Sequence, residues 1–155
     1  LDMRRRPFWF WMWTLFFSVP AAAEIKVAFF VHRDLEGRII RYEPGGKFAH
    51  VAIAFGDRWV HAHPHRGVEI LDSIQALGTE VRILLDPNAS PPDSDRISAL
   101  LGLRYDPTFR WDDADSTYCS KLVANLLDLD PTRMQFRTPG WIGLRSLPRG
   151  RLGIS

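Results

Sequence analysis

The segment from His50 to Ala62 constrains the fold more than any other part of this 155-residue chain. Two runs rich in β-branched and aromatic residues, HVAIAF and RWVHA, flank the dipeptide Gly56-Asp57. Such a dipeptide between two strand-like runs is typical of a tight turn, so the pattern predicts an antiparallel β-hairpin. With an even number of residues in the turn, Ala54 lies opposite Trp59, Ala52 opposite His61 and His50 opposite His63.

Side chains alternate along a strand, so this hairpin has two unlike faces. The residues of one face are His50, Ala52, Ala54, Trp59, His61 and His63; those of the other are Val51, Ile53, Phe55 and Val60. The second face is uniformly apolar and is expected to be core. On the histidine face the small alanines leave space for a helix that carries a nucleophile.

The rest of the pattern predicts one α+β domain over residues 24–155. Further strands are expected at 25–31, 37–42, 67–71 and 80–85. One helix is expected to open at Pro91–Ser94 and to run to about residue 101, and another to span 118–127, with Ser116 and Thr117 as its caps. No internal repeat or interior domain boundary is evident.

Residues 3–23 have the three parts of a secretory signal peptide: the basic run 4–6, the apolar stretch 7–19 and small residues at Ala21 and Ala23. Cleavage after Ala23 would start the mature chain at Glu24 and export it to the periplasm or the medium, without a stable membrane span. Leu1 and Asp2 carry no interpretation. The alternative is a retained anchor, although the apolar stretch is shorter than the ~20 residues of a span.

Charge argues against a nucleic-acid partner. Without arginines 4–6 and Asp2, acidic and basic side chains balance at 17 each, whereas such binding requires unbalanced Lys and Arg that face phosphates. His61, His63 and His65 are spaced like metal ligands, but Pro64 interrupts the strand and no carboxylate or cysteine completes a cluster. We expect neither a metal nor a cofactor.

Cys119 is the single cysteine of the chain. In an exported protein an unpaired cysteine is a buried apolar residue, an intermolecular disulfide or a reactive nucleophile. Its place in the first turn of the helix over 118–127 predicts a thiol pKa below the ordinary value of about 8.5, because the helix dipole favours the thiolate. Its spacing from Leu122 and Val123 also fits a core position, so periodicity alone leaves these alternatives open.

Several short motifs together resemble one family. They are HVAI at 50–53, VHA at 60–62, Gly67-Val68, Tyr105-Asp106 with Phe109, and YCSKLV at 118–123. In this order they resemble the NlpC-type cysteine hydrolases of the papain-like superfamily, and most of all their circularly permuted, YiiX-like branch, to which lecithin retinol acyltransferase is more distantly related. The resemblance implies a circularly permuted papain-like fold, an antiparallel sheet packed against helices.

The resemblance also implies roles for individual residues. Cys119 matches the nucleophile, His50 the general base and His61 the residue that orients the base, a place that His63 or Glu69 could fill instead. The family usually has Gly where Ala52 stands, and often an acid at the position of Lys121. Both departures bear on the shape and polarity of the cleft.

The implied function is an exported cysteine hydrolase. Its substrates would be amide bonds of peptidoglycan peptides, or acyl amides and esters of lipid-like molecules. For the second class, Tyr105, Phe109 and Trp111 could line a groove that holds the acyl chain. A non-catalytic module that binds wall peptide or lipid is the main alternative, and a secreted structural protein with a Cys119 disulfide is another. The oligomeric state stays open.

Overall fold

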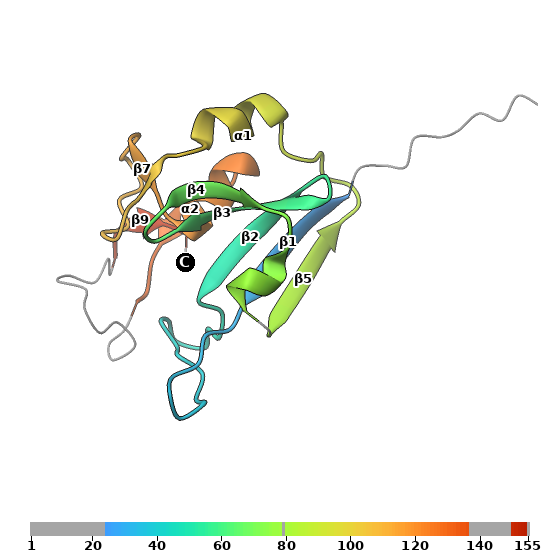
Figure 1. Cartoon of the computed structure of the whole chain (residues 1–155). Helices are drawn as coiled ribbons and strands as arrows, with labels where there is room; N and C mark the ends of the chain where they lie inside the picture. The colour runs from blue at the N-terminus through green and yellow to red at the C-terminus, as the bar shows by residue number, and fades with distance from the viewer. Residues whose placement is uncertain (1–23, 79, 137–149, 155) are drawn as a thin grey trace, which may run out of the picture.

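Figure 1 gives the computed structural model of the chain, which describes residues 24–78, 80–136 and 150–154. The expected α+β class is confirmed: an antiparallel five-stranded sheet in the order β4-β3-β2-β1-β5 packs with two α-helices in the described part. Its strands are β1 (Ile25–Phe30), β2 (His50–Phe55), β3 (Arg58–His63), β4 (Gly67–Leu71) and β5 (Val81–Asp86).

The remaining elements are short. The two α-helices are α1 (Ser94–Leu100) and α2 (Cys119–Leu126), and a 3-10 turn, η1, covers Ile74–Leu77. The strands β6 (Arg104–Tyr105) and β7 (Ser116–Thr117) pair in parallel, while β8 (Thr132–Arg133) and β9 (Leu152–Gly153) pair antiparallel.

The predicted hairpin register is confirmed for the pairs nearest the turn. Ala54 lies opposite Trp59, and Phe55 lies opposite Arg58 across a turn of two residues. Gly56 adopts a φ of 63° there, which glycine reaches without strain. The described ladder ends at Ile53 opposite Val60, before the expected pairs Ala52–His61 and His50–His63. The packing still divides the two faces as expected, with Val51, Ile53 and Val60 in one cluster and Ala52 with Trp59 in another.

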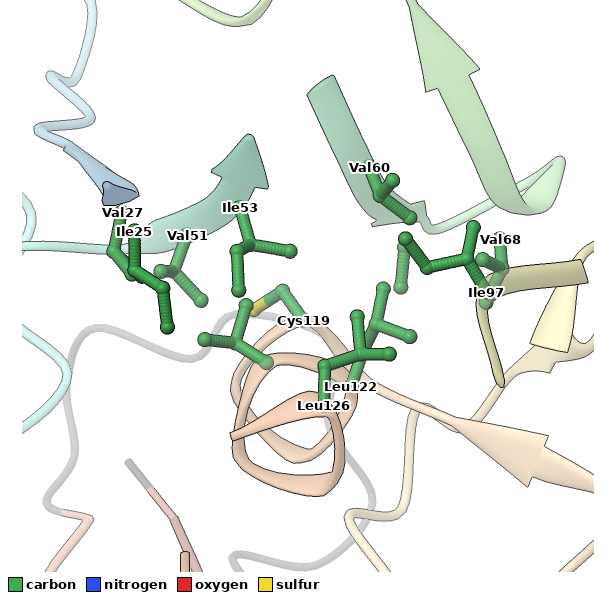
Figure 2. Close-up of a cluster of buried hydrophobic side chains, with 12 residues drawn as sticks. Ile25, Val27, Val51, Ile53, Val60, Val68, Ile97, Cys119, Leu122 and Leu126 are labelled. Atoms are coloured by element: carbon green, nitrogen blue, oxygen red, sulfur yellow. The ribbon is translucent and has the colours of Figure 1, made fainter. Parts of the chain in front are cut away.

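The helix that carries Cys119 covers the opposite face from the one we expected. Cys119 and Leu122 pack in one buried cluster with Val51, Ile53 and Val60 of the apolar face (Figure 2). The other face, at Ala52, is filled by Phe30, with Trp59, Ile74 and Leu77 packed against it. The reason is that an amphipathic helix buries most apolar surface against the apolar face of a sheet.

Two local expectations are wrong. Residues 37–42 form no strand, only an isolated bridge between Arg33 and Ile39. Ser116 and Thr117 belong to β7, and the residue before α2 is Tyr118, which makes no side-chain cap. At α1 the cap is Asp93, whose carboxylate accepts from the Asp95 N–H. Ser116 and Thr117 do not cap α2 because their backbone pairs with β6 instead.

Gly67 fixes the start of β4 and with it the position of Glu69. A Cβ at residue 67 would lie 2.2 Å from the carbonyl oxygen of Leu103, and the φ is +75°. The Val68 N–H donates to that same carbonyl, and the Gly102 N–H donates to the carbonyl of Val68. The outer edge of β4 is thus covered by backbone of the 102–103 segment.

Within the described residues no helix has the length and apolarity to cross a membrane. The predicted signal peptide at 3–23, and the cleavage expected after Ala23, lie outside the described residues.

Candidate active site

A chain of polar side chains runs from the start of β2 across β3 to β4. His50 Nε2 lies 3.0 Å from His61 Nδ1, and His61 Nε2 lies 2.9 Å from Glu69 Oε1. Arg66 donates to both Glu69 oxygens, from Nε at 2.7 Å and from a terminal nitrogen at 2.6 Å. These four residues, which we call the histidine relay, join three neighbouring strands and the turn before β4.

The hydrogen bonds fix the tautomers. Ionised Glu69 only accepts, so His61 donates to it from Nε2. A neutral His61 then accepts at Nδ1, and the donor to it is the Nε2–H of His50. Nδ1 of His50 is left without a proton, and in the described part of the chain it has no hydrogen-bond partner. The relay therefore leaves Nδ1 of His50 as an unprotonated acceptor.

The pKa values agree with this assignment. Two hydrogen bonds from Arg66, and the bond from His61, hold the pKa of Glu69 at about 2, so its carboxylate is charged. Burial, together with the neighbouring rings of His61, His32 and His63, lowers the pKa of His50 to about 3. Burial also lowers the pKa of His61, against the opposing effect of Glu69. Both imidazoles are neutral at pH 7.

Cys119 lies beside the backbone next to His50, the first residue of the relay, without bonding to the relay. Its side chain is 8% exposed in the core, while the backbone N–H of Val51 points at its sulfur. The sulfur is thus beside the peptide that joins His50 to Val51. Among the described residues no hydrogen bond links the thiol to the His50 imidazole, yet both residues line one cavity.

The thiol pKa differs from the sequence-based prediction. Burial raises the pKa of Cys119 to about 11, although the N–H groups of Val51, Ser120 and Cys119 itself act to lower it. The prediction of a value below 8.5 used the position at the helix start and a His50 imidazole within reach of the thiol. It missed that the same helix presses the sulfur into the apolar cluster, where a thiolate loses its hydration. The resting pair is a neutral thiol and a neutral imidazole.

Alkylation of the native protein by iodoacetamide should follow this raised pKa. The rate is expected to climb about tenfold per pH unit from pH 7 to 10, because only the thiolate reacts. The same chain in urea should level off above its ordinary pKa of about 8.5. Since Cys119 is the only cysteine, mass spectrometry reads a single site. A plateau below pH 9 in the folded protein would contradict the buried, neutral thiol.

A cavity of about 900 Å³ opens beside Cys119 and His50. It runs between α2 and the β1–β5 side of the sheet, and its apolar lining includes Val27, Phe29, Val51, Leu84, Tyr105, Phe109, Val123, Leu127 and Phe136. Tyr105 and Phe109, which we expected to line an acyl groove, thus both line this cavity. Trp111 does not line this cavity; it packs at the edge of the cluster around Phe109 and Tyr118.

Two other sequence candidates have structural roles. His63 Nδ1 accepts the backbone N–H groups of His65 and Arg66, which shapes the turn into β4. Lys121 is buried and donates to the carbonyls of Arg110, Asp113 and Ser116. It therefore points away from the cavity, so its charge replaces no acid in the cleft.

Arg66 is the member of the relay that sequence reasoning missed. The spacing of Arg66 and Glu69 signals an ion pair on a helix, but here a turn joins them and no helix is present. Glu69 was named only through the family resemblance. In the described ranges no cluster of three or more His, Cys, Asp or Glu side chains is placed to hold a metal ion.

No protein-family model, curated protein or solved structure matches the chain.

Proposed function

We propose that the protein is a cysteine hydrolase in which Cys119 attacks a carbonyl carbon and His50 serves as the base. The observation that carries the proposal is the relay from Arg66 through Glu69 and His61, which leaves a bare Nδ1 on His50 beside the cavity that Cys119 lines. A histidine that only fills a core needs its hydrogen bonds satisfied, whereas this one keeps a free lone pair.

The first half of the reaction forms a thioester. The Cys119 side chain turns from the Val51 N–H toward His50, and its proton passes to Nδ1 as the sulfur bonds to the carbonyl carbon. The carbonyl oxygen takes the negative charge, which the N–H groups of Cys119 and Ser120, released as the sulfur turns away, stabilise. The tetrahedral carbon then expels the amine or alcohol, which leaves with the proton from His50.

Hydrolysis completes the cycle. A water molecule gives its proton to His50 Nδ1 and its oxygen to the thioester carbon, and the sulfur leaves and recovers that proton. In each step the protonated His50 donates to His61, which donates to Glu69. The Glu69 carboxylate thereby stabilises the positive charge on His50 through His61. Because thiol and imidazole are neutral at rest, proton transfer accompanies attack instead of preceding it.

The lining of the cavity favours one of the two substrate classes. Its walls are mainly aliphatic and aromatic, and among them lie Val27, Phe29 and Leu84. Charged residues also line it, namely Glu43, Lys47, Asp86 and Asp128. They are outnumbered by the apolar residues, which suit an acyl chain better than the several carboxylates and amines of a wall peptide. We therefore place acyl amides and esters ahead of peptidoglycan peptides as substrates.

The proposed fold is the circularly permuted papain-like one. It is supported by the order of the residues, with His50 and His61 on strands that precede the helix of Cys119. If residues 3–23 act as a signal peptide, the enzyme works outside the cytoplasm.

Trapping of an acyl-enzyme tests the proposal. p-Nitrophenyl esters with acyl chains of four to twelve carbons are expected to leave an acyl group on Cys119, detected by mass spectrometry and released by hydroxylamine. Longer chains should react with higher kcat/KM because the apolar cavity binds them. Cys119→Ala is the control and should carry no acyl group. A γ-D-glutamyl peptide that is cleaved faster than every ester would favour the wall-peptide class.

A binding module on the same scaffold predicts a different result. Ligand would bind with the affinity of the native protein in both Cys119→Ala and His50→Ala, and no thioester would form on native protein. Saturable binding without any acylation would therefore replace the hydrolase proposal. A disulfide-linked dimer that disappears on reduction would support the remaining alternative, a secreted structural protein that is cross-linked through Cys119.

A further inference from the structure

The strand β5 is an apolar, unpaired edge of the sheet. Among the described residues it hydrogen bonds only to β1, on one side, and every one of its residues is exposed. Val81, Ile83, Leu84 and Leu85 are 39%, 43%, 46% and 55% exposed. Native proteins usually protect such an edge with lysine, proline, a bulge or a covering loop, because free N–H and C=O groups recruit another strand.

The other edge of the sheet is treated differently. The backbone of residues 102–103 bonds to Val68 and covers the outer side of β4. In β5 the sequence VRILLD contains neither lysine nor proline, and no described segment hydrogen bonds to its outer side. Of the two sheet edges, β5 is therefore the one at which a further strand can pair.

The sequence of β5 is complementary to itself. When two copies run antiparallel with Leu84 opposite Leu84 of the other copy, Arg82 lies opposite Asp86 and Ile83 opposite Leu85. Neither Arg82 nor Asp86 makes an ion pair in the described part of its own chain. Each copy thus supplies the opposite charge that the other lacks, twice across one two-fold axis.

We propose that the protein forms a homodimer in which β5 pairs with β5 of a second copy about an axis through Leu84. The two sheets then continue into one, and the axis is perpendicular to it, so the same face stays uppermost in both copies. Leu84 lines the cavity beside Cys119. The two cavities therefore open on one face of the joined sheet and meet across the dimer axis.

Cysteine cross-linking of the full chain tests the register. In a Cys119→Ala background, Leu84→Cys should oxidise to a dimer, because directly opposed residues have Cα atoms about 4.5–5.5 Å apart. Ile83→Cys alone should cross-link several-fold less, since two residues of offset separate its copies by about 8 Å. A mixture of Ile83→Cys and Leu85→Cys should restore the dimer. Equal yields at all positions, or none at any, would overturn the proposal.

A charge swap tests the self-complementarity. Arg82→Asp or Asp86→Arg alone places like charges opposite each other twice and should lower the cross-linking of Leu84→Cys about tenfold. The double variant Arg82→Asp with Asp86→Arg restores opposite charges and should recover the yield. Arg58→Asp, three strands away in the sheet, changes the charge equally and should leave it unchanged. Failure of the double variant to recover would refute this register, whatever the fate of the hydrolase activity.

Discussion

Replacing either Cys119 or His50 by alanine is expected to lower kcat/KM for an acyl ester by about 10³-fold or more. Cys119 supplies the atom that bonds to substrate. His50 holds the one ring nitrogen of the relay that has no hydrogen-bond partner among the described residues. Because the two act in one step, the double variant should be scarcely slower than either single one. The measurement is steady-state hydrolysis, with circular dichroism as the check of folding. Additive losses would mean that the two residues work separately.

The pH dependence separates His50 from an ordinary histidine. Nδ1 must be unprotonated to accept the thiol proton, and the pKa of His50 is about 3. Activity should therefore persist at pH 4–5 and fall only toward pH 3, below the usual limb near 6.5. In His50→Ala the residual rate depends on free thiolate and should rise about tenfold per unit up to pH 10, as the pKa of Cys119 is about 11. An acidic limb near 6.5 would exclude His50 as the base.

The hairpin was predictable because its information is local. A two-residue turn and strict alternation determine which residues of β2 and β3 share a face, so Ala54 opposite Trp59 followed from the sequence. The helix around Cys119 was also predictable from its spacing, with its first residue one position later than expected. Neither signal says which face of the sheet the helix covers.

The placement of Cys119 depended on long-range packing. Leu122 and Val123 share its helix face, and they drive α2 onto Val51 and Ile53. The sulfur is carried into the core with them, and the cost of burying a thiolate there outweighs the helix dipole. An argument from the helix start and a nearby His50 therefore gave the wrong sign for the pKa shift.

The second half of the relay depended on contacts across the sheet. His61 reaches Glu69 because β3 pairs with β4 in the register that sets them opposite each other. Gly67, opposite His63 in that register, must be a glycine because backbone of residue 103 leaves no room for a Cβ. No pattern in the sequence around Glu69 indicates this close approach. Composition and periodicity therefore identified the histidines as candidates, but not the Glu69 carboxylate that bonds to His61.

Glu69→Gln is expected to lower kcat by about 10²-fold or more, although the side chain keeps its size. The amide has one oxygen, and Arg66 offers two donors to it, so the NH₂ group turns to His61 Nε2. His61 must then accept at Nε2 and carry its proton on Nδ1. Facing that N–H, His50 accepts at Nε2, and its own proton moves to Nδ1, the atom that should receive the thiol proton.

Comparison with three other variants isolates the tautomer from simple loss of contact. Glu69→Ala removes the carboxylate without offering a donor, so it should be no worse than Glu69→Gln. His61→Ala should be severe, whereas His61→Asn or His61→Gln keeps one hydrogen bond to His50 and should retain more activity. His63→Ala should be mild, and His65→Ala, outside the relay, serves as the control.

¹⁵N NMR of the imidazoles reads the tautomer directly: in native protein the proton of His50 is expected on Nε2, and in Glu69→Gln on Nδ1. A slow Glu69→Gln enzyme with the native tautomer would show that the carboxylate acts through its charge alone, and full activity in both Glu69 variants would remove the relay from the mechanism.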